Sequence, residues 1–172
     1  MQKAVSIVVV QGKKAFLGTR LNLLDNYRKR CFPGGKVEDG ESCLQSACRE
    51  LHQETGFLTT ELLPLGKLML QNPDFGAYEA HGFAVRLPPK VRLVNLEPKK
   101  NGGWRAIPLI HILKMRDEKL LPGTKFFVKA ASSQFGLSQV PTSNRERHRT
   151  KKHEVFYRRT NSAAEEAPRP QP

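Results

Sequence analysis

Five of the 16 acidic residues of this basic chain lie in one short segment, residues 32–57, which also carries a pair of glycines. The whole chain has 29 Lys and Arg against 16 Asp and Glu, so the cluster needs an explanation. At about 100° per residue, Glu50 and Glu54 lie one helical turn apart on the same side, with Gln53 beside them. Like charges at this spacing destabilise an isolated helix. A divalent metal reverses that sign, because hard cations bind carboxylate and carbonyl oxygens.

The residues around this pair suit a loop that closes over a metal. Gly34 and Gly35 allow a tight turn that aims a backbone carbonyl at the ion. Glu41, near the helix start, matches the positive end of the helix dipole and has a structural role. Arg49 points away from the acidic pair and is expected to fix the loop through Glu41 or a backbone carbonyl. Lys36 follows the glycines and brings positive charge near a substrate.

The spacing of these residues resembles the Nudix box, G-x5-E-x7-R-E-U-x-E-E-x-G-U, where U is an apolar residue. By chance, its six fixed charged or glycine positions match in roughly 10⁻⁷ of windows at average residue usage. The preceding FPGG sequence is similar to that of MutT-like proteins. The matching residues are Gly35, Glu41, Arg49, Glu50, Leu51, Glu54, Gly56 and Phe57.

One position departs from the box, because Gln53 stands where the family usually has the first of two adjacent glutamates. Gln53 can bind a metal through its neutral carbonyl or through a water, but it adds no charge. Two interpretations stay open. Either the site works with fewer metals or takes a ligand from elsewhere, or the box is a scaffold without activity.

The resemblance implies a fold, a cofactor and a reaction. The fold would be α/β (α+β), an α/β/α sandwich with a mixed sheet and the box as loop-helix-loop. The reaction would be Mg²⁺-dependent hydrolysis of a nucleoside diphosphate linked to another group, with Mn²⁺ as the alternative metal. A nucleoside triphosphate would give monophosphate and pyrophosphate. Glu54 would be a metal ligand, Glu50 a ligand or the general base, and Arg49 a further catalytic-site residue.

Residues outside the box supply further candidates. Glu97 lies in the segment NLEPKKNGGWRAI, which is similar to a loop of MutT-like triphosphate diphosphatases in which an acid reaches the metal. A plain loop glutamate explains it equally well. Arg20 is similar to a family position that contacts phosphate, and a solvated strand-end arginine is the equal alternative. For Trp104, packing is favoured over stacking on a base.

Apolar patterning predicts the elements that must position these residues. Strands alternate with helices, which favours an α/β or α+β fold. Leu44, Ala47, Cys48 and Leu51 form a predicted buried stripe on the main helix, and Gly56 ends that helix. The expected strands are residues 4–10, 15–17, 62–70, 79–87 and 104–107, and the expected helices are residues 41–55, 110–115 and 125–133.

Composition sets the domain organisation and the range of partners. Residues 1–138 form one predicted domain, and residues 139–172 a basic tail with too few apolar side chains to fold. The net charge of +13 favours a polyanionic partner, a nucleotide above all, with weak RNA or DNA contact through the tail. Three cysteines predict a cytoplasmic protein, and the run at residues 4–10 is too short to span a membrane. A monomer and a homodimer both stay open.

Three functions remain open on the sequence. The leading one is a MutT-like hydrolase of modified or non-standard nucleoside triphosphates. The second is an RNA 5′-end or cap pyrophosphohydrolase, for which the basic tail would supply backbone contacts. The third is a catalytically silent nucleotide- or RNA-binding module, suggested by Gln53.

Overall fold

A mixed β-sheet forms the centre of the molecule, which we describe from a computed structural model covering residues 1–22, 26–72 and 76–137. The strand order is β3-β2-β1-β5-β4, and β6 pairs with β2. β1 runs parallel to β5, whereas the β1–β2 and β4–β5 pairs are antiparallel. The strands are β1 Lys3–Gln11, β2 Lys14–Thr19, β3 Arg30–Cys31, β4 Leu63–Asn72, β5 Gly76–Arg86 and β6 Arg105–Pro108.

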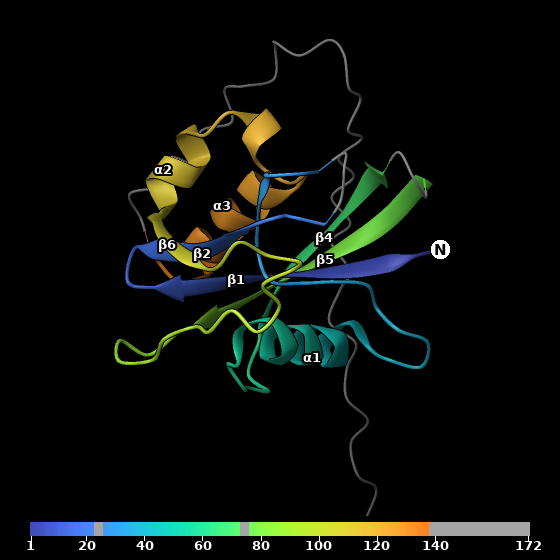
Figure 1. The fold of residues 1–172 in the computed structure, drawn as a ribbon, viewed down its shortest axis with the longest axis horizontal. Coiled ribbons are helices and arrows are strands. Elements are labelled where there is room, and N and C mark those ends of the chain that lie inside the picture. Colours follow the sequence, from blue (N-terminus) through green and yellow to red (C-terminus); the bar gives the residue numbers. More distant parts are fainter. Residues whose placement is uncertain (23–25, 73–75, 138–172) are drawn as a thin grey trace, which may run out of the picture.

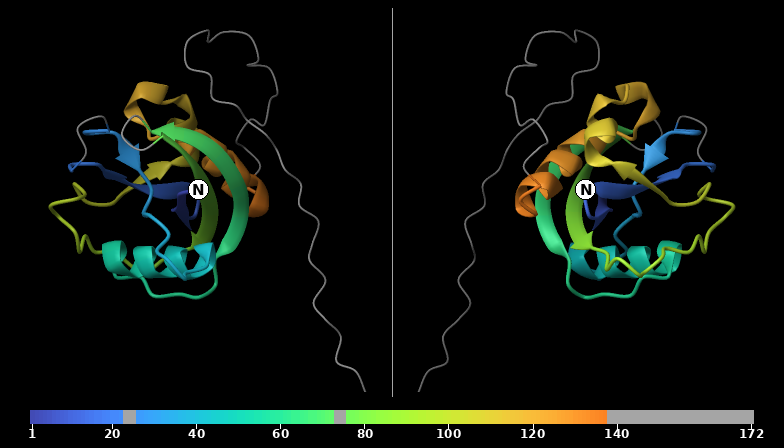
Figure 2. Two further views of the ribbon diagram at one scale, coloured as in Figure 1. Left: turned by 90° about the vertical axis from the view of Figure 1, so that its right-hand side faces the viewer. Right: turned by 90° about the vertical axis from the view of Figure 1, so that its left-hand side faces the viewer.

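Helices cover both faces of this sheet (Figures 1 and 2). One face carries α1, and the other carries α2 and α3. A short 3₁₀ turn, η1, links the last two helices. The bounds are α1 Cys43–Thr55, α2 Leu109–Lys114, η1 Asp117–Lys119 and α3 Thr124–Gln134. The expected α/β/α sandwich with a mixed sheet is confirmed.

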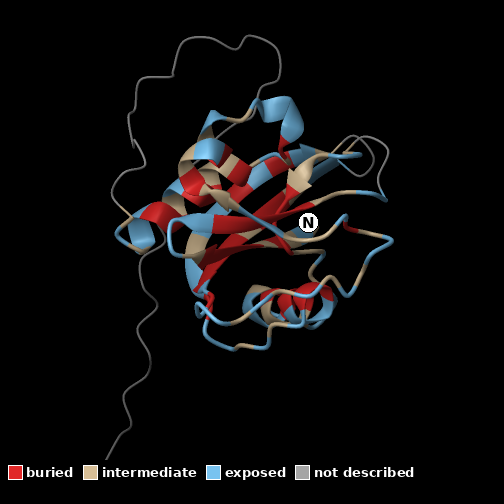
Figure 3. Ribbon diagram, turned by 60° about the vertical axis from the view of Figure 1, so that its left-hand side comes forward, coloured by how far each residue is buried: buried red, intermediate tan, exposed pale blue. Residues whose placement is uncertain are grey.

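The two cores follow from β1, whose side chains alternate between the faces of the sheet. Val8 and Val10 pack on the side of Ile112 and Phe127. Ile7 and Val9 point to the other face and pack against α1. Both faces are therefore apolar, as in a strand buried on two sides. Figure 3 shows the buried residues concentrated on these central strands. β1 holds the sheet between the helical layers and gives α1 a fixed platform.

Capping residues define both ends of α1. The Ser42 hydroxyl accepts the backbone N–H of Gln45, and the Gln45 side chain accepts the N–H of Ser42, a reciprocal capping box. At the other end Gly56 adopts the left-handed conformation and donates to the His52 carbonyl, as predicted. The helix therefore begins at Cys43, two residues after the predicted start, and Glu41 lies outside its first turn.

The predicted apolar stripe on α1 is only half right. Ala47 and Leu51 are fully buried, but Cys48 is half-buried and Leu44 is 42% exposed. The buried side of the helix is rotated toward the site and includes both Glu50 and Glu54. The helix thus buries its acidic residues with its apolar ones, instead of presenting them beside the apolar face.

Candidate active site

Glu54 is the most deeply buried acidic side chain of the site, with 1% of its surface exposed. Its Oε2 accepts the backbone N–H of Gly34 at 3.0 Å. Its Oε1 accepts the Asn101 side-chain amide at 3.3 Å and pairs with the Lys100 ammonium at 2.8 Å. Both carboxylate oxygens are therefore held, one by the glycine turn and the other by the loop before β6.

Residues 33–37 run as an extended segment between β1 and α1. The odd-numbered residues bond to β1: the Pro33 and Gly35 carbonyls accept from Ile7 and Val5. The even-numbered residues face the helix, since the Gly34 N–H reaches Glu54 and the Lys36 carbonyl accepts from α1 side chains. This alternation turns the Gly34 carbonyl away from β1, as a backbone metal ligand would require.

Neither glycine can be replaced without disturbing the site. Gly34 has a φ of 155°, and a Cβ there would collide with the Val5 carbonyl. A Cβ on Gly35 would collide with the carboxylate of Glu50, which fills the space beside it. The glycines let the backbone lie directly against the acidic residues.

Arg49 joins the loop to the helix and also contacts the acidic pair. Its guanidinium makes two bonds to Glu41, at 2.7 and 3.0 Å. It also donates to Glu50 at 2.8 Å, to Gln53 at 3.1 Å and to the Lys36 carbonyl. The expected link to Glu41 and a carbonyl is present, but Arg49 does not point away from Glu50. The hydrogen bond from Arg49 lowers the pKa of Glu41 to about 2.

Gln53 does not join the buried carboxylates. Its side chain is exposed and its amide oxygen accepts from Arg49. It therefore lies on the outer side of Arg49, whereas Glu54 lies beneath the glycine turn. Helical spacing alone could not separate the two, because the rotation of α1 against the sheet decides which residue is covered.

Lys100 lies among three carboxylates and was not identified from the sequence. Its ammonium is 2.8 Å from Glu54, 3.0 Å from Glu97 and 3.8 Å from Glu50. Glu97, chosen from the loop similarity, is thus linked to the two helical glutamates through the Lys100 ammonium. The i,i+3 spacing of Glu97 and Lys100 was the available signal, but it does not show that both side chains reach across to α1.

Asn101 was also missed, although it is 1% exposed and supports the same cluster. Its amide nitrogen donates to Glu54, and its amide oxygen lies 3.7 Å from the sulfur of Cys31. Burial raises the pKa of the Cys31 thiol to about 11. Asn101 follows two lysines and precedes two glycines, a pattern that is typical of an exposed loop. The sequence therefore does not indicate that its side chain is buried.

Burial and pairing act in opposite directions on the ionic contact between Glu54 and Lys100. Burial raises the pKa of Glu54, and the hydrogen bond from Lys100 only partly offsets this effect. Burial also disfavours the Lys100 ammonium, but the carboxylates of Glu54 and Glu97 outweigh it and raise the lysine pKa. The Lys100 ammonium and the Glu54 carboxylate form an ion pair, because their 2.8 Å separation is that of a charge-assisted contact.

The side chains at this site fit a hard divalent cation in chemistry, though not yet in spacing. Three carboxylates and a backbone carbonyl are the oxygen ligands that Mg²⁺ and Mn²⁺ prefer. Within the described residues, however, no three His, Cys, Asp or Glu side chains are grouped closely enough to hold a metal. The carboxylates are spread around the Lys100 ammonium, which takes the place of a cation between them.

The remaining sequence candidates lie around this cluster. Arg20 has a buried Nε that finds no hydrogen-bond partner among the described residues, and its charge lowers the pKa of Cys31, against the larger effect of burial. Lys36 is exposed at the mouth of the glycine turn. Trp104 packs its ring on Gly18 and donates to the Glu54 carbonyl, so packing, the favoured interpretation, is what the structure shows.

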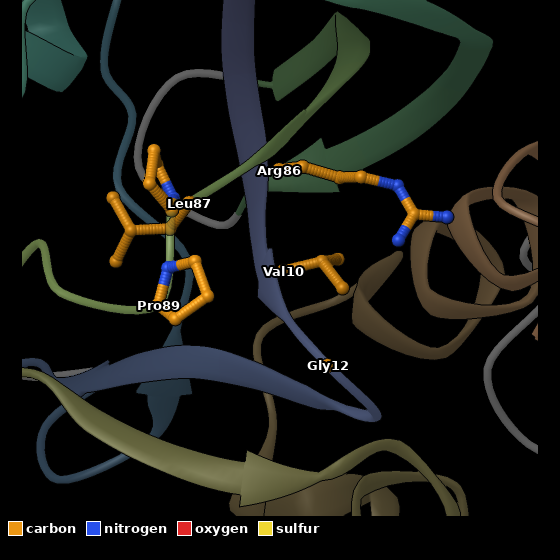
Figure 4. A pocket seen from close by; sticks show the side chains of 6 residues that line it. Val10, Gly12, Arg86, Leu87 and Pro89 are labelled. Carbon is orange, nitrogen blue, oxygen red and sulfur yellow. The ribbon is translucent and has the colours of Figure 1, made fainter.

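A separate pocket of about 330 Å³ lies where β1 and β5 end (Figure 4). It contains no acidic side chain and only one charged residue, so its lining does not match metal or phosphate chemistry. We therefore place the candidate active site at the carboxylate cluster. The pocket is lined by Val10, Gly12, Arg86, Leu87, Pro88 and Pro89.

Helix length bears on the membrane question. Among the residues that the structure describes, none of the helices combines the length and apolar character needed to cross a bilayer.

Comparison with known proteins identifies the family of the chain. The NUDIX domain model matches residues 1–123. The 8-oxo-dGTP diphosphatase of Escherichia coli (strain K12) is 34% identical over 74 residues, which are 43% of this chain and 57% of that protein. The sequence match thus spans little more than half of that relative.

Solved structures show the same fold at low identity. The MutT protein of Methanosarcina mazei Go1 has a TM-score of 0.64 and 23% identity, with 77% of this chain and 94% of that chain covered. A bifunctional NMN adenylyltransferase/ADP ribose pyrophosphatase of Francisella tularensis, complexed with AMP and a manganese ion, has a TM-score of 0.62 and 19% identity. That match covers 77% of this chain and 41% of that one.

One class of protein agrees with the box residues, the sandwich fold and the domain match. The chain belongs to the NUDIX family, whose members are pyrophosphohydrolases of nucleoside diphosphates linked to another group and generally depend on a divalent metal.

Proposed function

We propose that this protein hydrolyses a nucleoside triphosphate, of modified or non-standard type, to the monophosphate and pyrophosphate. The observation that carries the proposal is that Glu50, Glu54 and Glu97 all lie within 3.8 Å of the Lys100 ammonium, with Glu54 also bonded to the Gly34 N–H of the glycine turn. A relative that is an 8-oxo-dGTP diphosphatase supports a triphosphate substrate. The net charge of +13 favours an anionic substrate of this kind.

Mg²⁺ is the proposed metal, with Mn²⁺ as an alternative supported by the manganese ion of the Francisella tularensis structure. Glu50, Glu54, Glu97 and the Gly34 carbonyl would hold it. When bound, the ion neutralises phosphate charge and lowers the pKa of a bound water. The sequence proposal that Gln53 is a ligand is the weakest of the set, because its oxygen is engaged by Arg49.

The hydrogen bonds of Glu54 and Glu50 support different roles for them, Glu54 as a metal ligand and Glu50 as the general base. Both oxygens of Glu54 are held by neighbours, which suits a ligand in fixed orientation. Glu50 has one oxygen on Arg49 and its other oxygen 3.8 Å from the Lys100 ammonium, so that second oxygen is better placed to accept a proton. Arg49 would orient Glu50, while Arg20 and Lys36 would contact the phosphates.

The deciding experiment is a pyrophosphate-release assay on purified full-length protein with MgCl₂. The panel contains standard and oxidised nucleoside triphosphates, ADP-ribose, a dinucleoside polyphosphate and capped RNA. We expect turnover of at least one triphosphate, with monophosphate and pyrophosphate as products. Cleavage of capped RNA alone would favour the RNA 5′-end alternative. No turnover of any panel member would favour the silent binding module.

The cytoplasmic location, the monomeric or dimeric state and the contact of the tail with RNA or DNA remain predictions. The tail lies outside the described residues.

A further inference from the structure

Lys100 occupies the position where a cation would be shared by the acidic residues. Within the described residues it is the one basic side chain whose ion pairs reach Glu50, Glu54 and Glu97 together. No feature of the Nudix box requires a lysine there. Its side chain therefore needs an explanation of its own.

The lysine and a metal would need the same lone pairs. The Lys100 ammonium is 2.8 Å from Oε1 of Glu54 and 3.0 Å from Oε2 of Glu97, while the second oxygen of Glu54 already accepts the Gly34 N–H. Among the described residues that Glu97 oxygen is buried without a hydrogen bond, so the ammonium is the charge that faces it. A divalent ion of the Mg²⁺ type binds carboxylate oxygens at about 2.0–2.1 Å, which leaves no room for an ammonium at the same point. The two cations are mutually exclusive at these oxygens.

The backbone around Lys100 is fixed, so displacement concerns the side chain alone. Its N–H donates to the Glu97 carbonyl, and its own carbonyl accepts from Leu21. The next residue, Asn101, is buried and pairs with Arg20 across the strand end. The flexible four-carbon stem can still swing the ammonium outward without moving the loop.

We propose that Lys100 is a resident counter-ion that competes with the divalent metal for Glu54 and Glu97. This inference rests on the proposed function, since it takes the carboxylates as the metal site. In the metal-free protein the ammonium neutralises buried carboxylates that would otherwise be costly. A metal that arrives with phosphate groups gives the released ammonium an anionic partner, whereas free metal does not. Lys100 thereby couples metal binding to phosphate binding.

The test measures Mn²⁺ binding by the loss of the free-ion electron paramagnetic resonance signal, with and without methylenediphosphonate as a stable diphosphate. Full-length wild type is compared with Lys100→Met. Lys99→Met is the matched control, because Lys99 is an exposed neighbour in the same loop. We expect Lys100→Met to bind Mn²⁺ alone roughly tenfold more tightly, because a lost hydrogen bond to a charged group is worth this much or more. We expect it to gain less than wild type from the diphosphate.

Thermal unfolding guards against a folding defect in the variant. In EDTA, Lys100→Met should melt below wild type, and Mn²⁺ should raise its midpoint more than it raises that of wild type. Lys100→Gln, which keeps a donor but no charge, should show the same order with smaller shifts. Lys99→Met should match wild type in both assays.

The outcomes separate this inference from the proposed function. If wild type binds Mn²⁺ and Lys100→Met binds it no more tightly, the competition is wrong and the hydrolase proposal stands. If Lys100→Met gains Mn²⁺ affinity while no panel substrate is hydrolysed, the competition holds and the hydrolase proposal fails. If none of the proteins binds Mn²⁺ in either condition, both are overturned.

Discussion

At the residue scale, Glu54 shows how much structure is devoted to one carboxylate. A buried charge is unfavourable unless it is paired and hydrogen-bonded. Three groups from two distant loops, Gly34, Lys100 and Asn101, reach this side chain. A residue with a purely structural role could be replaced by an apolar one at little loss. The glycine turn that leaves room for Glu50 argues that these carboxylates are kept for chemistry.

Replacing Glu54 by glutamine should abolish most activity. The amide keeps the shape but removes the negative charge, so we expect turnover on the best panel substrate to fall by roughly a hundredfold or more. Steady-state kinetics at saturating Mg²⁺ measures the effect. Glu61→Gln is the matched control, because Glu61 is exposed away from the cluster. Wild-type rates in Glu54→Gln would mean that the ligands are wrongly assigned.

Gln53→Glu tests whether the departure from the box weakens the metal site. The new carboxylate would lie beside Glu50, with Arg49 still able to neutralise part of its charge. We expect several-fold tighter Mn²⁺ binding in isothermal titration calorimetry, because each added carboxylate increases the attraction for a hard cation.

The control for this variant is His52→Glu, which adds the same charge at an exposed position on the helix. An equal gain in both variants would mean that general charge, and not the box position, sets the affinity. No gain in Gln53→Glu would exclude position 53 as a ligand.

At the element scale, local signals predicted most of the elements and non-local packing accounts for what was missed. The strands β1 and β2, the Gly56 cap and the box spacing all depend on a few neighbouring residues. The exposure of Leu44 depends on how α1 sits on the sheet, which periodicity does not report. Lys100 and Glu54 are distant in sequence, and they meet because the loop before β6 folds back onto α1. No local sequence pattern could therefore pair them.

The β4–β5 pair yields a prediction on pH. Glu79 is buried on β5, where Lys67 from β4 and His81 hold it. The hydrogen bond from Lys67 lowers the pKa of Glu79 below its ordinary value of 4.5. Because the folded pKa is the lower one, this stabilisation is complete above about pH 4.5 and is lost as pH falls through the folded pKa.

We expect Glu79→Gln to lower the free energy of unfolding by about 1.5 kcal/mol at pH 7, the lower end for a hydrogen bond to a charged group. The difference from wild type should shrink as pH falls below 4.5 and through the lowered folded pKa of Glu79, because the protonated carboxyl is then as uncharged as the Gln side chain. Urea unfolding at several pH values measures both quantities. A difference that stays constant from pH 7 to pH 3 would show that the ion pair contributes nothing.

At the scale of the whole molecule, an acidic site lies within a strongly basic chain. Local carboxylates attract a divalent metal, while the surrounding charge of +13 attracts the phosphates that the metal is proposed to hold. The fold keeps the carboxylates together within this basic chain. Helix α1 carries Glu50 and Glu54 on one face of the sheet, and the loop before β6 brings Lys100 and Glu97 to the same place.

Residues 141–172 test how far the site is independent of the tail. They carry eight basic and four acidic residues, whereas every residue assigned to the site lies within the NUDIX match at residues 1–123. Deleting them should change kcat/KM for a small nucleotide by no more than about twofold, since none of the metal or phosphate contacts is removed.

RNA binding of the truncated protein should weaken and become less salt-dependent, because each lost phosphate contact reduces counterion release. Fluorescence anisotropy with a 5′-triphosphate RNA at two salt concentrations measures this. A full-length variant with the eight basic residues changed to Gln separates charge from length, and loss of small-nucleotide turnover in either protein would place the tail in the active site.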